Sequence, residues 1–194
     1  MPDKKHLLAG FLVLTALGLL AGPISAAEFS AVVVRRLNSQ ESQGKVYVKG
    51  DKVYREFVTG REVTITILRP DKEVIWMVMP GRKVYMEMPL TEEMTRELGQ
   101  LAKDQASMTH LGTETVNGYL SDKYETSVKN NGGFIKHTMW VSKKLGVPIK
   151  ITSPEGSFSM DYRDIKEGGV PDSVFEAPAG YQKMNKPGEA PPMK

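Results

Sequence analysis

Short β-type segments that recur between turn-forming residues restrict the fold of this chain more than any other feature. From Phe29 onward, runs rich in valine, isoleucine, tyrosine and phenylalanine alternate with turns about every dozen residues or fewer. Asn117-Gly118, between two such runs, is the strongest short signal for a β-hairpin. The expected strands are residues 29–36, 45–49, 53–58, 63–68, 74–79, 84–88, 111–116, 119–126, 134–141, 149–152 and 157–164. This spacing predicts an antiparallel meander and therefore a mainly β fold, with a polar turn over residues 38–44.

One segment departs from this β pattern after Pro89. Thr91 can cap a helix, and the two glutamates that follow place negative charge at the positive end of its dipole. Apolar residues then recur at helical spacing, and their stripe includes Met94, Leu98 and Leu101. The sequence therefore predicts one amphipathic helix at about residues 91–107, lying over the sheet.

The N-terminal residues have the three parts of a secretory signal peptide. Lys4 and Lys5 are basic, residues 7–20 are apolar, and Ser25-Ala26-Ala27 offers small residues for cleavage. The apolar run is shorter than the roughly 20 residues that a transmembrane helix needs. We therefore expect residues 1–27 to be removed and the mature protein to be periplasmic, soluble and not membrane-spanning.

The rest of the chain is long enough for one domain with its own core, expected over residues 28–182. The chain has no cysteine, so disulfide bonds cannot stabilise this domain. Residues 183–194 are polar and rich in proline, which predicts a disordered tail. Basic and acidic residues are scattered and form no basic block, which argues against a nucleic-acid partner.

The strand at residues 75–79 is apolar on both of its faces. Ile75, Met77 and Met79 point one way, whereas Trp76 and Val78 point the other. Such a sheet could close over its own inner face as a small packed barrel, or leave an apolar cavity lined by adaptable methionines. If a cavity is present, the residues expected to line it are Ile75, Trp76, Met77, Met79, Met86, Met88, Met94, Leu98 and Leu101.

Two stretches of the sequence resemble a known group of exported proteins. The run Gly112-Thr-Glu-Thr-Val-Asn-Gly-Tyr119 leading to Lys123-Tyr124, and the closing stretch from Val170 to Tyr181, are similar to the LolA-like periplasmic proteins. The resemblance implies an unclosed β-barrel, formed by a curved antiparallel sheet, whose concave face is covered by helix and holds lipid or an acyl chain. It identifies no individual ligand-binding residue.

No set of residues in the sequence indicates catalysis or a cofactor. The mature part has two histidines, His110 and His137, without the third ligand that a catalytic zinc site requires. The sequence also lacks a GxSxG elbow and a glycine-rich phosphate loop. We therefore expect a binding protein without enzymatic activity, metal or cofactor.

Two pairs of methionines leave a different interpretation open. Met77 and Met79 lie on one expected strand, and Met86 and Met88 lie on the next, with their sulfurs on one face. Thioethers are soft ligands suited to Cu(I), but methionine also fills apolar surfaces without any metal. The main hypothesis is a periplasmic carrier of a lipid or of a lipoprotein acyl chain. The alternatives are an interaction or envelope-stress-sensing module with an envelope protein partner, and a methionine-based Cu(I)-binding protein.

Overall fold

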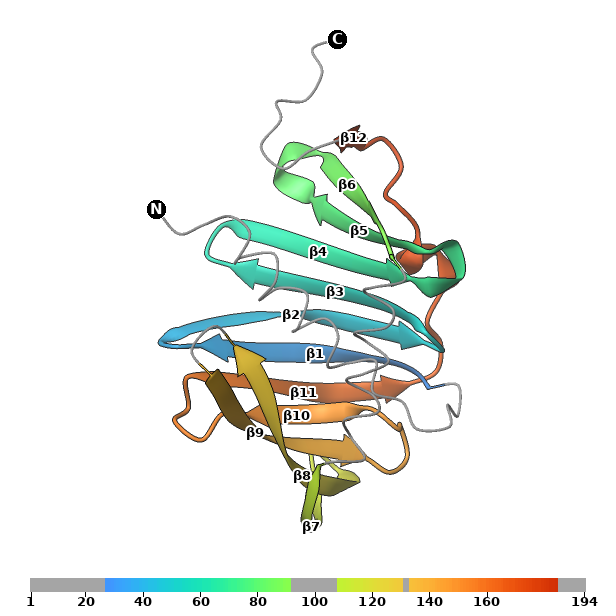
Figure 1. Ribbon diagram of the computed structural model, residues 1–194. Helices are drawn as coiled ribbons and strands as arrows, with labels where there is room; N and C mark the ends of the chain where they lie inside the picture. Colours follow the sequence, from blue (N-terminus) through green and yellow to red (C-terminus); the bar gives the residue numbers. More distant parts are fainter. Residues whose placement is uncertain (1–26, 92–107, 131–132, 185–194) are drawn as a thin grey trace. The chain divides into compact units, whose positions relative to one another are not determined.

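The computed structural model describes residues 27–91, 108–130 and 133–184, most of which lie in β-strands (Figure 1). The predicted signal peptide and the helix predicted at about residues 91–107 fall almost entirely outside these ranges. No helix within the ranges has the length and apolar character needed to span a bilayer. The mainly β fold that the sequence predicts is confirmed.

The chain divides into two compact units. Among the described residues, we call 27–91 and 160–184 the split unit, because two distant stretches of sequence form it, and 108–130 and 133–159 the insert unit. The described strands of each unit form an open sheet and not a closed barrel. This agrees with the prediction of an unclosed sheet. The single domain predicted over residues 28–182 stays a prediction.

Eight strands of the split unit pair in the order β12-β6-β5-β4-β3-β2-β1-β11 (Figure 1). Their bounds are β1 (Glu28–Leu37), β2 (Gln40–Lys49), β3 (Lys52–Thr59), β4 (Glu62–Arg69), β5 (Val74–Met79), β6 (Val84–Pro89), β11 (Phe158–Glu167) and β12 (Gln182–Met184). β1 to β6 form antiparallel hairpins, whereas β12 runs parallel to β6. Two predictions are corrected here: the sheet is not wholly antiparallel, and Lys183 and Met184 lie in β12 rather than in a tail.

The connections between these strands are shorter than the sequence indicates. The turn predicted over residues 38–44 is confined to Asn38 and Ser39, because Gln40 already pairs with Leu37. Asn38 adopts a positive φ of 54°, a conformation that asparagine tolerates well. Short 3-10 helices, η1 (Pro70–Lys72) and η2 (Pro80–Arg82), connect β4 to β5 and β5 to β6.

The insert unit contains β7 (Thr109–Val116), β8 (Tyr119–Asn130), β9 (Gly133–Ser142) and β10 (Pro148–Thr152), paired in the order β10-β9-β8-β7. Asn117 and Gly118 have φ values of 49° and 84°, which confirms the predicted tight hairpin. The buried side chains of this unit include Met139, Trp140 and Ile149.

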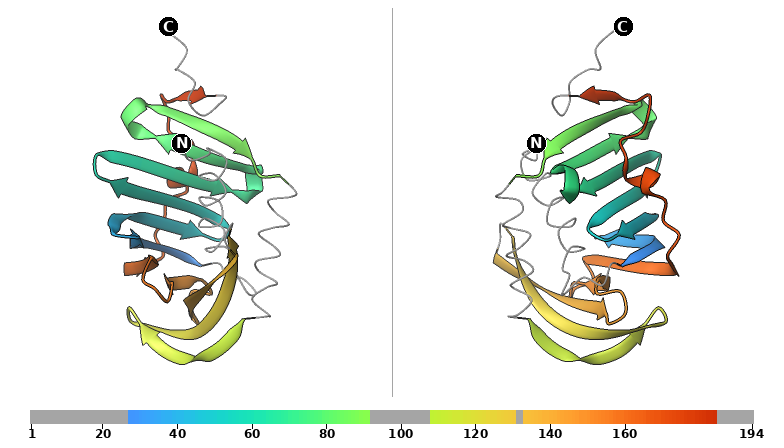
Figure 2. Two further views of the ribbon diagram at one scale, coloured as in Figure 1. Left: turned by 60° about the vertical axis from the view of Figure 1, so that its left-hand side comes forward. Right: turned by 90° about the vertical axis from the view of Figure 1, so that its right-hand side faces the viewer.

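The segment after β11 packs on one face of the split unit. Residues 170–181, which include η4 (Asp172–Phe175), run beside β3 to β5 (Figure 2). Phe175 is fully buried and packs with Trp76 and Val78. We call this side of the sheet the covered face. Trp76 and Ile75 project to opposite sides and both are buried, as expected for a strand that is apolar on both faces.

Candidate functional site

The opposite side of the split unit carries the methionines that the sequence analysis singled out. Met77 on β5 lies directly opposite Met86 on β6, and Met86 lies opposite Met184 on β12. Ile75 pairs with Met88, and Met79 pairs with Val84. Because paired residues in a sheet share a face, these side chains form one surface, which we call the methionine face.

The methionine face continues over the rest of the sheet. Thr66 pairs with Met77 and Leu68 pairs with Ile75, and the register carries the same side on to β3, β2 and β1. Its buried apolar residues on these strands are Phe29, Ala31, Val33, Val46, Val48, Val53, Phe57 and Leu68. A continuous apolar surface of this kind suits an extended hydrocarbon ligand better than a compact polar one.

Two arginines interrupt this apolar surface. Arg35 donates from Nε to Ser42 Oγ at 3.2 Å, and its guanidinium carbon lies 4.1 Å from the centre of the Phe57 ring. Burial lowers the pKa of Arg35, although an arginine stays protonated. Arg55 is buried on β3, opposite Val46 and Thr66. The methionine face therefore combines apolar area with fixed positive charge at its β1–β3 side.

Arg69 binds residues 170–181 to the covered face through hydrogen bonds. Its guanidinium donates to both carboxylate oxygens of Asp71 at 2.7 Å, to the Phe175 carbonyl at 3.0 Å and to Glu176 Oε1 at 2.6 Å. These hydrogen bonds raise the pKa of Arg69 and lower that of Asp71 to about 2. The hydrogen bond from Lys72, followed by that from Arg69, also lowers the pKa of Glu176.

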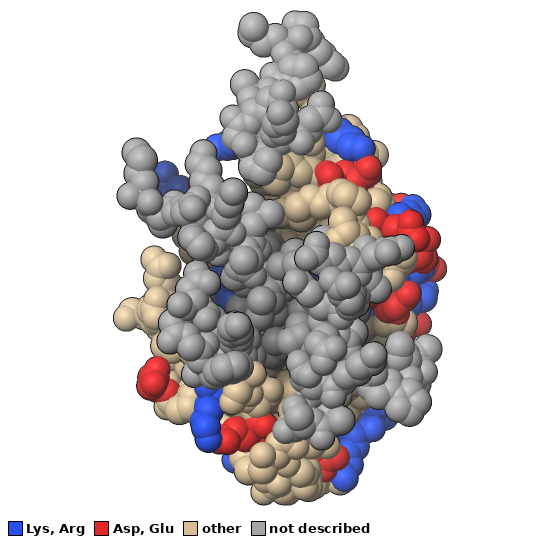
Figure 3. All heavy atoms as spheres, viewed as in Figure 1, with Lys and Arg blue, Asp and Glu red and all other residues tan. Residues whose placement is uncertain are grey.

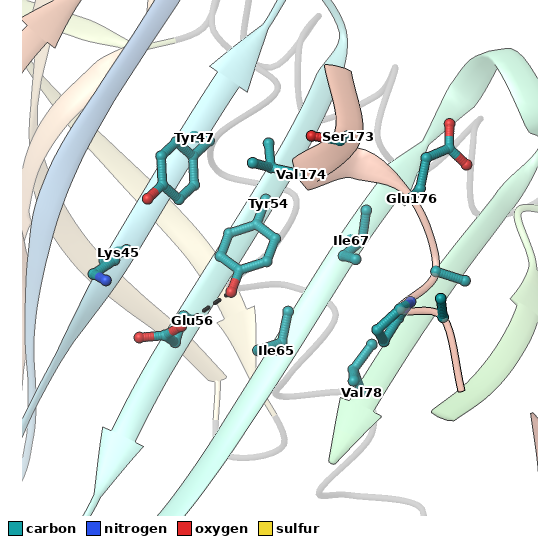
Figure 4. A pocket seen from close by; sticks show the side chains of 13 residues that line it. Lys45, Tyr47, Tyr54, Glu56, Ile65, Ile67, Val78, Ser173, Val174 and Glu176 are labelled. Carbon is teal, nitrogen blue, oxygen red and sulfur yellow. Dashed lines mark hydrogen bonds between the residues drawn. The ribbon is translucent and has the colours of Figure 1, made fainter. Parts of the chain in front are cut away.

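A pocket of about 510 Å³ opens on the covered face between strands β2 to β5 and the segment after η4 (Figure 4). The Tyr54 side chain projects from β3 into this pocket, and its hydroxyl donates to Glu56 Oε2 at 3.0 Å (Figure 4). Burial and the neighbouring Glu56 raise the pKa of Tyr54, so this phenol stays protonated at neutral pH. The lining residues are Lys45, Tyr47, Tyr54, Glu56, Ile65, Ile67, Val78, Ser173, Val174, Glu176, Ala177, Pro178 and Ala179.

The structure brings together part of the predicted groove. Ile75, Met77, Met79, Met86 and Met88 share the methionine face. Trp76 lies on the covered face instead, because neighbouring residues of a strand point to opposite sides, and its Nε1 donates to Glu87 Oε2 at 3.0 Å. Met94, Leu98 and Leu101 lie outside the described residues.

Sequence reasoning missed Met184 and the pocket residues. Met184 falls in a short polar stretch without β periodicity, and nothing local in the sequence indicates that it pairs with β6. The pocket had a weak signal, since Tyr47 and Tyr54 lie on the same side of neighbouring strands, but the covering segment could not be foreseen.

The histidines and charges do not indicate a second site. His110 Nε2 lies 3.4 Å from Asp122 Oδ1, and His137 Nδ1 lies 3.1 Å from the Ile135 carbonyl. Within residues 27–91, 108–130 and 133–184, no group of three or more His, Cys, Asp or Glu side chains is arranged to hold a metal. Basic and acidic side chains of the described residues are interspersed on the side that Figure 3 shows.

Comparison with models of known protein families identifies the family of this chain. Residues 35–147 match the model of a domain of unknown function, DUF4412. The chain belongs to the DUF4412 family. The matched range includes β5 and β6, and thus four of the methionines on the methionine face of this DUF4412 protein. No curated protein matches the sequence significantly.

Solved structures resemble this DUF4412 protein in fold at low sequence identity. An uncharacterised conserved protein from Thermus thermophilus has a TM-score of 0.59 at 12% identity, with 92% of this chain and 99% of that chain covered. MucB has a TM-score of 0.47 at 14% identity, with 91% of this chain and 65% of MucB covered. The Mycobacterium tuberculosis lipoprotein LppX has a TM-score of 0.43 at 13% identity, with 86% and 95% covered. The predicted resemblance to the LolA-like group is confirmed as a likeness of fold.

Proposed function

We propose that this protein binds an apolar ligand, a lipid or an acyl chain, on the methionine face. The observation that carries the proposal is the continuous apolar character of the methionine face across β1 to β6 and β12. The chain's own residues 170–181 pack on the face that bears Trp76 and Val78. The other face extends its apolar surface over β6 and β12 and back to β1, which gives a hydrocarbon chain a long surface to contact.

The residue types on the methionine face support an adaptable binding surface. Methionine is unbranched and polarizable, so it adjusts to ligands of irregular shape better than leucine or isoleucine does. Arg35 can pair with an anionic headgroup or a carboxylate, and it supplies no acid–base chemistry because an arginine stays protonated. The protein is therefore a non-catalytic binder, exported to the periplasm by the signal sequence in residues 1–27.

Native mass spectrometry of the purified protein, followed by organic extraction, tests for ligand that co-purifies. We expect adducts with the masses of fatty acids or phospholipids, and displacement of a fluorescent fatty-acid probe by oleate. Met79→Glu places a charge on the half-buried methionine face and should weaken probe binding at least tenfold. Val58→Glu is the matched control, because Val58 is 39% exposed on β3 and its side chain does not belong to the methionine face.

Two results would reject the proposal. One is a protein that carries no lipid and does not bind the probe at micromolar concentration. The other is an equal loss of probe binding in Met79→Glu and Val58→Glu, which would indicate general destabilisation. Far-UV circular dichroism of both variants verifies that the sheet is intact.

A protein-interaction function is the second candidate, and the edge of the insert unit favours it. Among the described strands, β7 pairs with β8 alone, and Leu111 and Leu120 on these strands are about half exposed. An exposed edge strand can add a strand from a partner. Site-specific cross-linking from position 111 in envelope extracts would capture one defined partner under this hypothesis, and Leu111→Lys would abolish the cross-linked product.

A further inference from the structure

Three methionines from three different strands form a single row on the methionine face. Met77, Met86 and Met184 are consecutive partners in the register of β5, β6 and β12. Neighbouring strands lie about 4.8 Å apart, so three flexible thioether side chains in one row can bring their sulfurs to a common point. Met86 and Met184 pack in one buried cluster with Val84, and Met77 and Met79 pack against that cluster.

Contacts on the other side of the sheet hold these strands in register. Glu87 accepts a hydrogen bond from Trp76 Nε1 at 3.0 Å and another from Lys183 Nζ at 2.6 Å, so it connects β5, β6 and β12. The hydrogen bond from Lys183, followed by that from Trp76, lowers the pKa of Glu87. The Gln182 amide also donates to the Lys83 carbonyl at 2.9 Å. Because Lys183 faces away from the methionine face, this anchoring directs its neighbour Met184 towards Met86.

We propose that Met77, Met86 and Met184 form a binding site for a soft monovalent metal ion, Cu(I) or Ag(I). Thioethers select Cu(I) over harder ions such as Zn²⁺. A thioether sulfur carries no proton near neutral pH, so binding needs no deprotonation and should depend little on pH. An apolar site also admits a singly charged ion at a lower desolvation cost than a doubly charged one.

The distribution of residue types distinguishes this site from ordinary apolar packing. Strands β5, β6 and β12 contain five methionines and no leucine, although leucine is a common residue for filling a sheet face. The third sulfur comes from the C-terminal end of the described chain and not from the two methionine pairs in β5 and β6. Packing alone does not require a methionine at each of the three positions of one row.

Anaerobic titration of the purified protein with Cu(I), in competition with bicinchoninate, tests the site. We expect one Cu(I) per chain, with an affinity that changes less than threefold between pH 6 and pH 8. Met77→Leu, Met86→Leu and Met184→Leu should each weaken binding at least tenfold. Met139→Leu, which changes a fully buried methionine of the insert unit, is the control and should leave the affinity unchanged.

A spectroscopic measurement identifies the ligands directly. In protein labelled with ¹³C at the methionine methyl groups, Ag(I) should shift the signals of Met77, Met86 and Met184 and leave that of Met139 in place. The proposal is overturned if no Cu(I) binds, if the three leucine variants bind as the parent does, or if the shifted signals belong to other methionines.

The proposed metal site and the proposed lipid site can be rejected independently of each other. Methionine to leucine keeps the methionine face apolar, so the three leucine variants should lose far less affinity for the fatty-acid probe than Met79→Glu does. Loss of probe binding in Met79→Glu, with Cu(I) binding retained, would support the lipid site without any bearing on the three sulfurs. A protein that binds Cu(I) but no lipid would retain this inference and reject the proposed function.

Discussion

Replacing Arg69 by methionine tests how residues 170–181 are held on the covered face. The Arg69 side chain is 6% exposed and donates to Asp71, to Glu176 and to the Phe175 carbonyl. Methionine keeps much of the apolar stem of arginine and removes the guanidinium. The change therefore deletes the hydrogen bonds while largely preserving the packing of the stem.

The expected loss follows from the environment of each partner. The side chains of Asp71 and Glu176 are 40% and 48% exposed, so water replaces Arg69, and each ion pair contributes about 0.5–1 kcal/mol. The Phe175 carbonyl belongs to a fully buried residue, and leaving a buried acceptor unsatisfied costs about 1–3 kcal/mol. Arg69→Met should therefore lower the free energy of unfolding of the split unit by about 3 kcal/mol.

Urea unfolding followed by tryptophan fluorescence measures this loss. Trp76 lies in the split unit and Trp140 in the insert unit, so a Trp140→Phe background reports on the split unit alone. Arg36→Met is the matched control, because Arg36 pairs with Glu41 and both side chains are 56% exposed. The reasoning fails if Arg69→Met costs less than about 1 kcal/mol, the upper end for an exposed pair such as that of Arg36.

Three further outcomes are expected from the same structure. Phe175→Ala removes a fully buried ring and should cost about 3–5 kcal/mol in urea unfolding, and a loss below about 1 kcal/mol would show that residues 170–181 are not part of the core. Gly44→Ala should cost at least about 1–3 kcal/mol, because a Cβ there would overlap a carbonyl of β3, whereas Gly81→Ala meets nothing within 4 Å and should leave the melting temperature almost unchanged. The pKa of Asp71 is lowered from 3.8 to about 2, so this carboxylate stabilises the fold above about pH 4 and its contribution is lost as the pH falls towards 2. Melting temperatures measured from pH 5 to pH 2 should fall less steeply in Arg69→Met, and equal slopes would contradict this assignment.

The local pattern of apolar and turn-forming residues was sufficient to locate most of the strands. The bounds predicted for residues 74–79 coincide with β5, because a continuous apolar run between two proline-containing turns marks both ends of the strand. Asn117-Gly118 located its hairpin for a similar reason, since only a few residue types adopt two successive positive φ values readily. The start of β2 was missed because Gln40 to Gln43 are polar, and polar residues at a strand end cannot be distinguished from a turn by pattern alone.

The candidate site was predictable in part, because alternation assigns residues to a face but does not show what packs on that face. It grouped Met77 with Met79 correctly. Trp76 was included in the predicted groove because the sequence does not show what packs on its side of the sheet. The residue that packs there is Phe175, about a hundred residues away in the sequence. Met184 could not be assigned, since a strand of three residues has too little periodicity and its pairing with β6 depends on the folded segment before it.

The split unit also determines the order in which the protein can fold. β1 lies between β2 and β11 in the sheet, and the Val170 amide donates to Glu28 Oε1 across 142 residues of sequence. During synthesis, the first six strands must wait for the last part of the chain before their sheet is complete. Until then, the Trp76 side of β5 lacks its cover and is open to unwanted association. Chaperone binding should therefore persist until residues near 184 have joined the sheet, because closing so long a loop is slow and unfavourable in entropy.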